Sequence, residues 1–152
     1  LQMVFDEGLY DPANEPDIAY PYLFSYFKGE EWRTQKETQR LLDKYFTTKP
    51  DGIPGNDDTG TMSSWAIFNM IGFYPDCPGL PEYTLTTPVF DKVTIRLDPK
   101  WYKEKELVIE SNRAQPGTLY INKVLLNGKK FNKYRITHDE LVHGQHIYFD
   151  LK

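Results

Sequence analysis

The chain has 152 residues, a net charge of −4 and a pI near 5.4, which allows one domain or two small ones with a real core. This acidic balance argues against nucleic acid as a partner, because phosphate binding requires a basic face. No run approaches the roughly 18 apolar residues of a membrane span, and the single cysteine, Cys77, cannot form an internal disulfide.

The first residue is Leu1 and not Met, which suggests that the chain is a fragment of a longer protein. The absence of a signal peptide therefore says nothing about the parent protein. Aromatic residues make up 15% of the chain. Their faces suit sugar C–H surfaces, but filling cores is their commoner use.

The first half of the chain has helical patterns in three places. Residues 18–27 follow a candidate N-cap, Asp17, and are apolar or aromatic nearly all round, with Pro21 in the first turn. Residues 31–46 form an amphipathic pattern, and residues 62–71 again have almost no polar face before Gly72 ends the pattern. The buried apolar face of this pattern is expected to consist of Leu41, Leu42, Tyr45 and Phe46. The residues expected to face water are Lys36, Glu37, Arg40 and Lys44.

Helices that are apolar all round should be buried on every side, and two such helices cannot cover each other in water. The helical half is therefore expected to be a slice of a larger helical assembly. A small independent α+β domain is the alternative.

The composition changes near residue 75, after which extended patterns dominate. Apolar residues alternate with polar ones at 93–97 and 107–109, and further strands are expected at 119–121, 124–126, 133–136 and 146–151. Asn127-Gly128 is a strong hairpin signal. Several short strands joined by short turns predict an antiparallel sheet or sandwich.

The loop at residues 55–60 is the first candidate site. Asn56, Asp57 and Asp58 lie between glycines, directly before a buried helix whose N-terminus favours negative charge. Such a loop can hold a carboxylate as a base, bind a hard cation through oxygen atoms, or cap the helix. The second acid argues against capping alone, because one would suffice.

The second candidate lies at Asn14-Glu15-Pro16-Asp17, before the first apolar helix. Glu15 is either a capping residue or an acid that points into a cavity. Two acidic loops before two buried helices also fit a shared mouth. His138, His143 and His146 have a spacing that could suit zinc, but they lie among hairpins where strand residues point to opposite faces, so no metal site is predicted there.

Several motifs in order resemble the C-terminal part of glycoside hydrolase family 92 α-mannosidases, over essentially the whole chain. The most specific stretch is Gly-Asn-Asp-Asp-Thr-Gly-Thr-Met-Ser-Ser-Trp at 55–65, followed by Gly-Phe-Tyr-Pro at 72–75. Asn-Glu-Pro at 14–16, Tyr-Leu-Phe-Ser-Tyr at 22–26, Trp-Arg-Thr-Gln at 32–35 and Leu-Leu-Asn-Gly at 125–128 also match. Downstream, Ile-Thr-His at 136–138 and Gly144 match as well.

The resemblance implies an α+β fragment, with the last helices of an (α/α)6 barrel at residues 1–75 and an antiparallel β-sheet or sandwich segment at 76–152. It implies a calcium-dependent, inverting exo-α-mannosidase that acts on terminal α-mannose of a glycan. The missing N-terminal part of the same protein would be a partner, and secretion, cell-surface or periplasmic residence would be expected.

The resemblance also assigns residues. Asp58 would be the general base, supported by Asn56 and Asp57, and the general acid would be a Glu outside this chain. Asn14 and Glu15 would lie near the sugar, with Glu15 as a calcium ligand.

One departure concerns the linkage. Members that prefer α-1,2 bonds carry His-Glu just before Asn-Glu-Pro, where this chain has Asp11-Pro12, so that preference is in doubt. The competing interpretation is a non-catalytic carbohydrate-binding or structural β-sandwich module.

Overall fold

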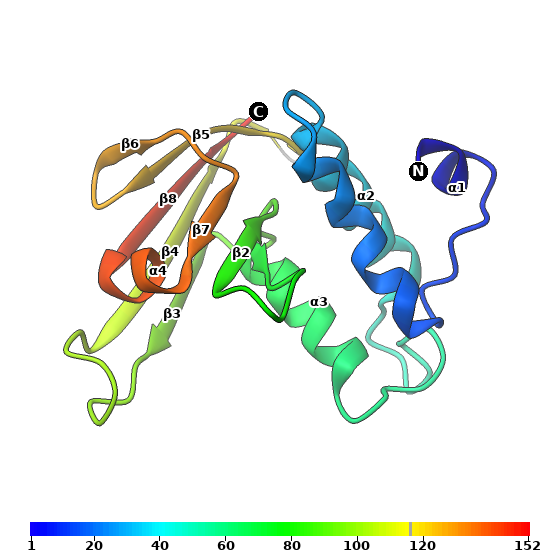
Figure 1. The fold of residues 1–152 in the computed structure, drawn as a ribbon, viewed down its shortest axis with the longest axis horizontal. Helices are drawn as coiled ribbons and strands as arrows, with labels where there is room; N and C mark the ends of the chain where they lie inside the picture. Colours follow the sequence, from blue (N-terminus) through cyan, green and yellow to red (C-terminus); the bar gives the residue numbers. More distant parts are fainter. Residues whose placement is uncertain (116) are drawn as a thin grey trace.

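The computed structural model describes residues 1–115 and 117–152, and it is a mixed α+β structure (Figure 1). Its helical elements are α1 (Gln2–Asp6), η1 (Glu15–Tyr26), α2 (Glu31–Tyr45), α3 (Thr61–Ile71) and α4 (His138–Gly144). Its strands are β1 (Phe73–Tyr74), β2 (Glu82–Leu85), β3 (Lys92–Arg96), β4 (Glu106–Arg113), β5 (Ile121–Leu126), β6 (Lys129–Phe131), β7 (Arg135–Thr137) and β8 (His146–Leu151). Among these described helices, none is long and apolar enough to cross a membrane.

The first apolar helix differs from the prediction in type and in its start. It is a 3₁₀ helix, η1, and it begins at Glu15 with Asn14 as the N-cap residue. Two of its residues are prolines, which lack the N–H group that a helix interior needs. Asp17 is therefore not the N-cap: its carboxylate lies inside the element and accepts a hydrogen bond from the side-chain nitrogen of Asn14 at 3.1 Å.

The apolar helices are expected to be buried on every side only with further helices around them, and within this chain each is buried on one face. Tyr22 is fully buried in η1, but Leu23 and Tyr26 are 40% and 53% exposed. In α3, Trp65 is buried whereas Ile67 is 57% exposed. Each apolar helix thus has one face in the core of the chain and another apolar face that this chain leaves uncovered.

Helix α2 matches its predicted bounds to within one residue, and Leu41 and Leu42 are buried as expected. Glu37 was predicted to face water, but it is only 2% exposed. Its carboxylate accepts a hydrogen bond from Arg40 Nε at 2.6 Å, one turn further along the helix. A buried carboxylate needs such a partner, and this i,i+3 pair supplies it.

Helix α3 has the predicted end. Its C-cap residue, Gly72, has a left-handed φ of 114°, a conformation that glycine adopts without a Cβ clash. A Cβ at this position would lie 3.1 Å from the Cβ of Pro88. Near the other end of the helix, Trp65 stacks on Phe46 with ring centroids 5.3 Å apart, which joins α3 to the end of α2.

The strands form two sheets, with orders β1-β2-β7 and β3-β4-β8-β5-β6. The predicted hairpin is confirmed: β5 and β6 pair antiparallel around Asn127 and Gly128, which both have positive φ. An antiparallel sheet was predicted throughout, and this is wrong at one pair, because β4 and β8 run parallel. The unpredicted helix α4 precedes β8 and lets the last strand enter between β4 and β5 in that direction.

The elements are arranged in space as a helical side and a sheet side. Figure 1 shows α1, η1 and α2 on one side, the five-stranded sheet on the other, and α3 with β2 between them. Each side has its own hydrophobic cluster, one around Tyr22, Leu41 and Trp65 and one around Ile109, Ile147 and Phe149.

A buried carboxylate, Asp76, joins η1 to the three-stranded sheet. Its side chain is 2% exposed and accepts hydrogen bonds from Arg135 Nη2 at 3.0 Å and from Thr84 Oγ1 at 2.7 Å, both in the small sheet. The hydroxyl of Tyr26 donates to the same carboxylate at 2.9 Å. Since Tyr26 is the last residue of η1, this contact fixes the end of the element that begins at Glu15.

Candidate functional site

The loop at residues 55–60 enters α3 through an unusual backbone. Asp58, Thr59 and Gly60 have φ values of 48°, 61° and 93°, so three consecutive residues are left-handed. Only glycine adopts this conformation without cost, and a β-branched residue such as Thr59 rarely does. Observed backbone strain of this kind is concentrated at functional sites.

Asp57 caps the helix that follows. Its carboxylate oxygen Oδ1 accepts the backbone N–H of Ser63 at 2.9 Å. Its carbonyl oxygen accepts the N–H groups of Gly60 and Met62 at 3.1 and 3.2 Å. Because the N-cap position is Gly60, which has no side chain, Asp57 supplies from upstream the bonds that a Ser or Asp would normally supply there.

Asp58 has a different role from its neighbour. Its carbonyl oxygen is bound by Thr61 N at 3.2 Å and by Thr61 Oγ1 at 2.7 Å, so its backbone is fixed. Its side chain is exposed, and its carboxylate has no hydrogen bond to any of the described residues. The side chain of Asn56 is exposed next to it. Of the functions that the sequence left open for this loop, capping belongs to Asp57. The carboxylate of Asp58 is left free.

The second acidic segment is tied more loosely. The Asn14 amide donates to Asp17, and the Asp11 carboxylate accepts the N–H of Ala13 at 2.9 Å. Asn14 and Glu15 are exposed, and within the described part of the chain the Glu15 carboxylate accepts no backbone N–H group. A capping role for Glu15 is therefore not what this geometry shows.

The fold brings the two acidic segments together. A Cβ at Gly55 would lie 2.8 Å from the Cβ of Ala13, so the two backbones touch where glycine permits it. The indole Nε1 of Trp65 also donates to the carbonyl of Ile18 at 3.2 Å, which fixes the start of η1 against α3. The neighbouring starts of η1 and α3 are consistent with the shared mouth that the sequence suggested.

Tyr74, which belongs to the Gly-Phe-Tyr-Pro motif at 72–75, packs against η1. Tyr74 stacks on Tyr22 with ring centroids 4.6 Å apart and planes 9° apart. Burial raises the pKa of the Tyr74 phenol, and the negative charges of Asp76 and Glu15 raise it further.

The acidic side chains of the described residues do not form a complete calcium site by themselves. Calcium takes six to eight oxygen ligands, whereas the described residues contain no group of three or more acidic, His or Cys side chains that could hold a metal ion. The exposed carboxylate of Glu15 fits as one hard oxygen ligand. The remaining ligands would have to come from other groups.

The three histidines have separate partners. His138 lies between two tyrosine hydroxyls, with Tyr83 at 2.9 Å from Nδ1 and Tyr102 at 3.1 Å from Nε2. His143 lies 3.1 Å from Asp139, and His146 lies 2.8 Å from Glu110. The contacts of His138 and His146 join α4 and β8 to neighbouring elements, whereas the contact of His143 with Asp139 lies within α4.

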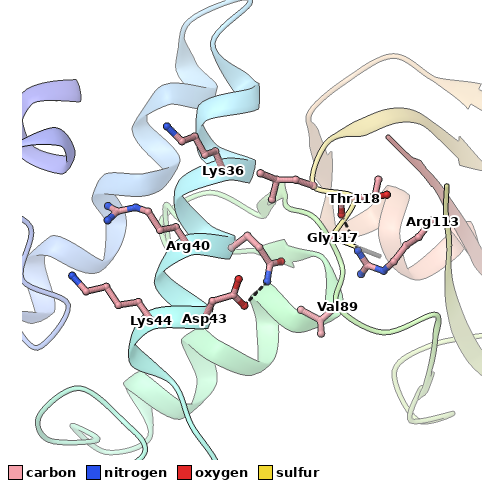
Figure 2. A pocket seen from close by; sticks show the side chains of 10 residues that line it. Lys36, Arg40, Asp43, Lys44, Val89, Arg113, Gly117 and Thr118 are labelled. Carbon is pink, nitrogen blue, oxygen red and sulfur yellow. Dashed lines mark hydrogen bonds between the residues drawn. The ribbon is translucent and has the colours of Figure 1, made fainter. Parts of the chain in front are cut away.

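A groove of about 770 Å³ lies away from the acidic segments, between α2 and the Gly117–Leu119 segment (Figure 2). Several of its polar side chains are already engaged: Arg113 donates to the carbonyls of Thr118 and Pro88, and Gln39 donates to Asp43. Figure 2 shows the charged ends of Lys36, Arg40 and Lys44 directed away from Arg113. The basic side chains therefore do not converge on a ligand.

The chain resembles known glycosidases over nearly all of its length. The chain is similar to an uncharacterized secreted glycosidase of Arthroderma benhamiae, with 28% identity over 95% of the chain. It is similar in structure to the family GH92 α-mannosidase BT3965 of Bacteroides thetaiotaomicron, with 33% identity over 95% of the chain and a TM-score of 0.82. The family GH92 inverting mannosidase BT2199 of the same organism matches 99% of the chain with 34% identity and a TM-score of 0.82.

The matches cover nearly all of this chain but only a small part of the other proteins. The chain spans 18% of the length of the Arthroderma protein and of BT3965, and 20% of BT2199. The family model that matches residues 2–152 is described as the glycosyl hydrolase family 92 catalytic domain. The chain belongs to glycosyl hydrolase family 92.

Proposed function

We propose that the chain carries part of the active site of an inverting exo-α-mannosidase, which removes terminal α-mannose from mannans or N-glycans. The relatives support this activity, since BT2199 is an inverting mannosidase and BT3965 has been seen in complex with mannoimidazole. Because the chain spans about a fifth or less of their length, the activity belongs to the full-length enzyme.

The observation that carries the proposal is the free carboxylate of Asp58 on a fixed backbone. The N–H groups of Thr61, Met62 and Ser63 at the start of α3 are all occupied by oxygen atoms of Asp57 and Asp58 other than the Asp58 carboxylate. The helix N-terminus still favours a negative charge nearby. An ionised carboxylate with no bond to the protein is available to accept a proton from water.

Inversion requires two carboxyl groups about 6.5–9.5 Å apart, with room for water between the base and the sugar. We assign the base to Asp58, which takes a proton from water as the oxygen attacks the anomeric carbon. Asp57 supports it by capping the helix, and Asn56 offers an exposed amide beside it. The acid that protonates the leaving oxygen is assigned to a Glu outside this chain.

Asn14 and Glu15 are assigned to the sugar side of the same mouth. The contact between Ala13 and Gly55 supports this, because it places their segment against the base loop. Glu15 would supply one ligand to calcium. When bound, the cation would hold sugar hydroxyl groups and stabilise the flattened ring of the oxocarbenium-like transition state.

The uncovered apolar faces of the chain support a proposal about which elements surround it in the full-length enzyme. We assign residues 1–75 to the last helices of an (α/α)6 barrel and residues 76–152 to a β-rich closing segment. The exposure of Leu23, Tyr26 and Ile67 supports contacts with further helices. Secretion is proposed for the full-length enzyme, because the Arthroderma relative is a secreted glycosidase.

Hydrolysis of an aryl α-mannoside by the full-length enzyme, followed by proton NMR, tests the proposal. Inversion predicts that β-mannose forms first and then mutarotates. The isolated 152-residue chain is the control, and it should give no turnover because the acid is missing. Formation of α-mannose first, or turnover by the isolated chain, would contradict the proposal.

A further inference from the structure

The turn that carries Asp58 is held in a costly conformation by groups that lie outside it. Thr59 adopts a φ of 61°, although β-branched residues avoid the left-handed region, and its exposed side chain has no hydrogen bond to the described residues. Nothing in Thr59 itself compensates for this conformation. The compensation must therefore come from the residues that fix the turn on either side.

Thr61 supplies the closest of these contacts. Its hydroxyl donates to the carbonyl of Asp58 at 2.7 Å, and its backbone N–H donates to the same oxygen at 3.2 Å. Thr61 is the first residue of α3, so it connects the turn to a regular and partly buried helix. The Asp58 backbone is thereby held at a fixed place relative to α3.

The same contacts determine where the Asp58 side chain can go. An acidic side chain just before a helix usually folds back and accepts the free N–H groups of the first turn. Here these N–H groups are already occupied by the Asp58 carbonyl and by Asp57. If the hydroxyl contact were lost, the turn could relax and the Asp58 carboxylate could compete for these groups.

We propose that Thr61, through its hydroxyl, and Thr59, through its left-handed backbone, are positioning residues that hold the Asp58 carboxylate away from the helix start. The inference rests on the proposed function, in which Asp58 is the base. In this proposal both threonines act through Asp58 and not directly on the substrate. Their effect should therefore appear in kcat and not in substrate affinity.

The test compares Thr61→Val with Thr61→Ser in the full-length enzyme. Valine keeps the shape and β-branching but removes the hydroxyl, whereas serine keeps the hydroxyl. Loss of positioning predicts that kcat falls about 10-fold in the valine variant with KM within about twofold of wild type. The serine variant should recover most of kcat. A valine variant with wild-type kcat, or a serine variant as slow as the valine variant, would overturn the proposal.

Thr59→Gly and Thr59→Asn provide a second test, which separates a loss of positioning from a loss of folding. Glycine relieves the strain but also lets the turn sample conformations outside the left-handed region, so the melting temperature should hold or rise while kcat falls. Asparagine tolerates the left-handed region and should keep more of the activity than glycine does. A glycine variant that is both more stable and fully active would refute the positioning role of Thr59.

Asp58→Asn, measured in parallel, separates this inference from the proposed function. If Asp58→Asn is slow and Thr61→Val is as fast as wild type, Asp58 remains the base and the positioning proposal fails. If Asp58→Asn is as fast as wild type, the base assignment fails, and the positioning proposal fails with it.

Discussion

Helices α3 and α4 begin in different ways, although acidic residues lie at both starts. At α4, Thr137 and Glu140 form a complete capping box: the hydroxyl of Thr137 accepts the N–H of Glu140 at 3.1 Å, and Glu140 accepts the N–H of Thr137 at 3.0 Å. Lys133 pairs with the same carboxylate at 2.9 Å. Glu140 satisfies the helix start, and the second acid of the first turn, Asp139, lies 3.1 Å from His143, whereas Asp58 has no such partner among the described residues.

The start of α3 has one more acid than capping needs. Asp57 alone supplies the side-chain cap, and the backbone passes through three left-handed residues before the helix begins. Such a turn is costly, whereas the box at α4 requires no unusual backbone. A local rule that is broken without structural benefit indicates a functional constraint. The difference between the two helix starts therefore indicates a functional role for Asp58.

Replacing Asp58 should have the largest effect on activity. In the full-length enzyme, Asp58→Asn should lower kcat by about 100-fold or more with a modest change in KM, because the general base is lost. The free energy of unfolding of the chain should change by less than about 0.5 kcal/mol, since the carboxylate makes no hydrogen bond to the described residues. Steady-state kinetics and urea unfolding measure the two effects. Wild-type rates would remove Asp58 from the mechanism.

Glu15 provides the next test. It is also an acid at the start of a helix, and its side chain does not cap that helix. Glu15→Gln should depress the activity of the full-length enzyme about 10-fold at low free calcium, with excess calcium restoring part of it. Activity should be measured against free calcium set by a chelator, with Glu7→Gln as a control at another exposed acid. If the variant matches wild type in rate and in chelator sensitivity, Glu15 is not a calcium ligand.

Asp57 should differ from Asp58 in its effect on stability. Asp57→Ala removes the cap on Ser63 and should destabilise the chain by about 1 kcal/mol in urea unfolding. Asp57→Asn should lose much less, because asparagine caps as well as aspartate. An alanine variant as stable as wild type would show that the cap contributes nothing, and the contrast between the two acids would then lose its physical basis.

Much of the fold could be predicted where pattern and termination signals agree. The amphipathic period gave α2 to within one residue, Gly72 marked the end of α3, and Asn127-Gly128 marked the hairpin. Helix α4 was missed although Thr137 and Glu140 have capping-box spacing, because the surrounding residues suggested strands. The parallel pairing of β4 with β8 depends on contacts between residues far apart in sequence, which local patterns do not encode.

The candidate site could be found in the sequence, but the separate roles of its acidic residues could not. Asn56, Asp57 and Asp58 are adjacent, and each has groups that could cap a helix. Which of them caps depends on the left-handed turn at 58–60, and threonine at position 59 gives no sign of such a turn. Glu37 was assigned to solvent for a similar reason, since its burial depends on tertiary packing.

Glu140 should give the smallest effect, and it completes the contrast between the two helix starts. Its pKa lies below the ordinary value of a glutamate, mainly because its carboxylate accepts the Thr137 N–H and secondly because Lys133 donates to it. A lowered folded-state pKa means that the ionised form contributes stability above the unfolded pKa. That contribution is lost as the pH falls below about 4.

Glu140→Gln keeps an acceptor for the capping box but removes the charge. At neutral pH it should lower the free energy of unfolding by only about 0.3 kcal/mol, because the side chain is partly exposed and ion pairs at the surface are weak. The variant should also lose less stability than wild type does between pH 5 and pH 3, which urea unfolding across that range would measure. Its kcat in the full-length enzyme should equal that of wild type, because this acid only caps a helix. A loss of activity without loss of stability would mean that the start of α4 also serves catalysis, and the contrast with α3 would fail.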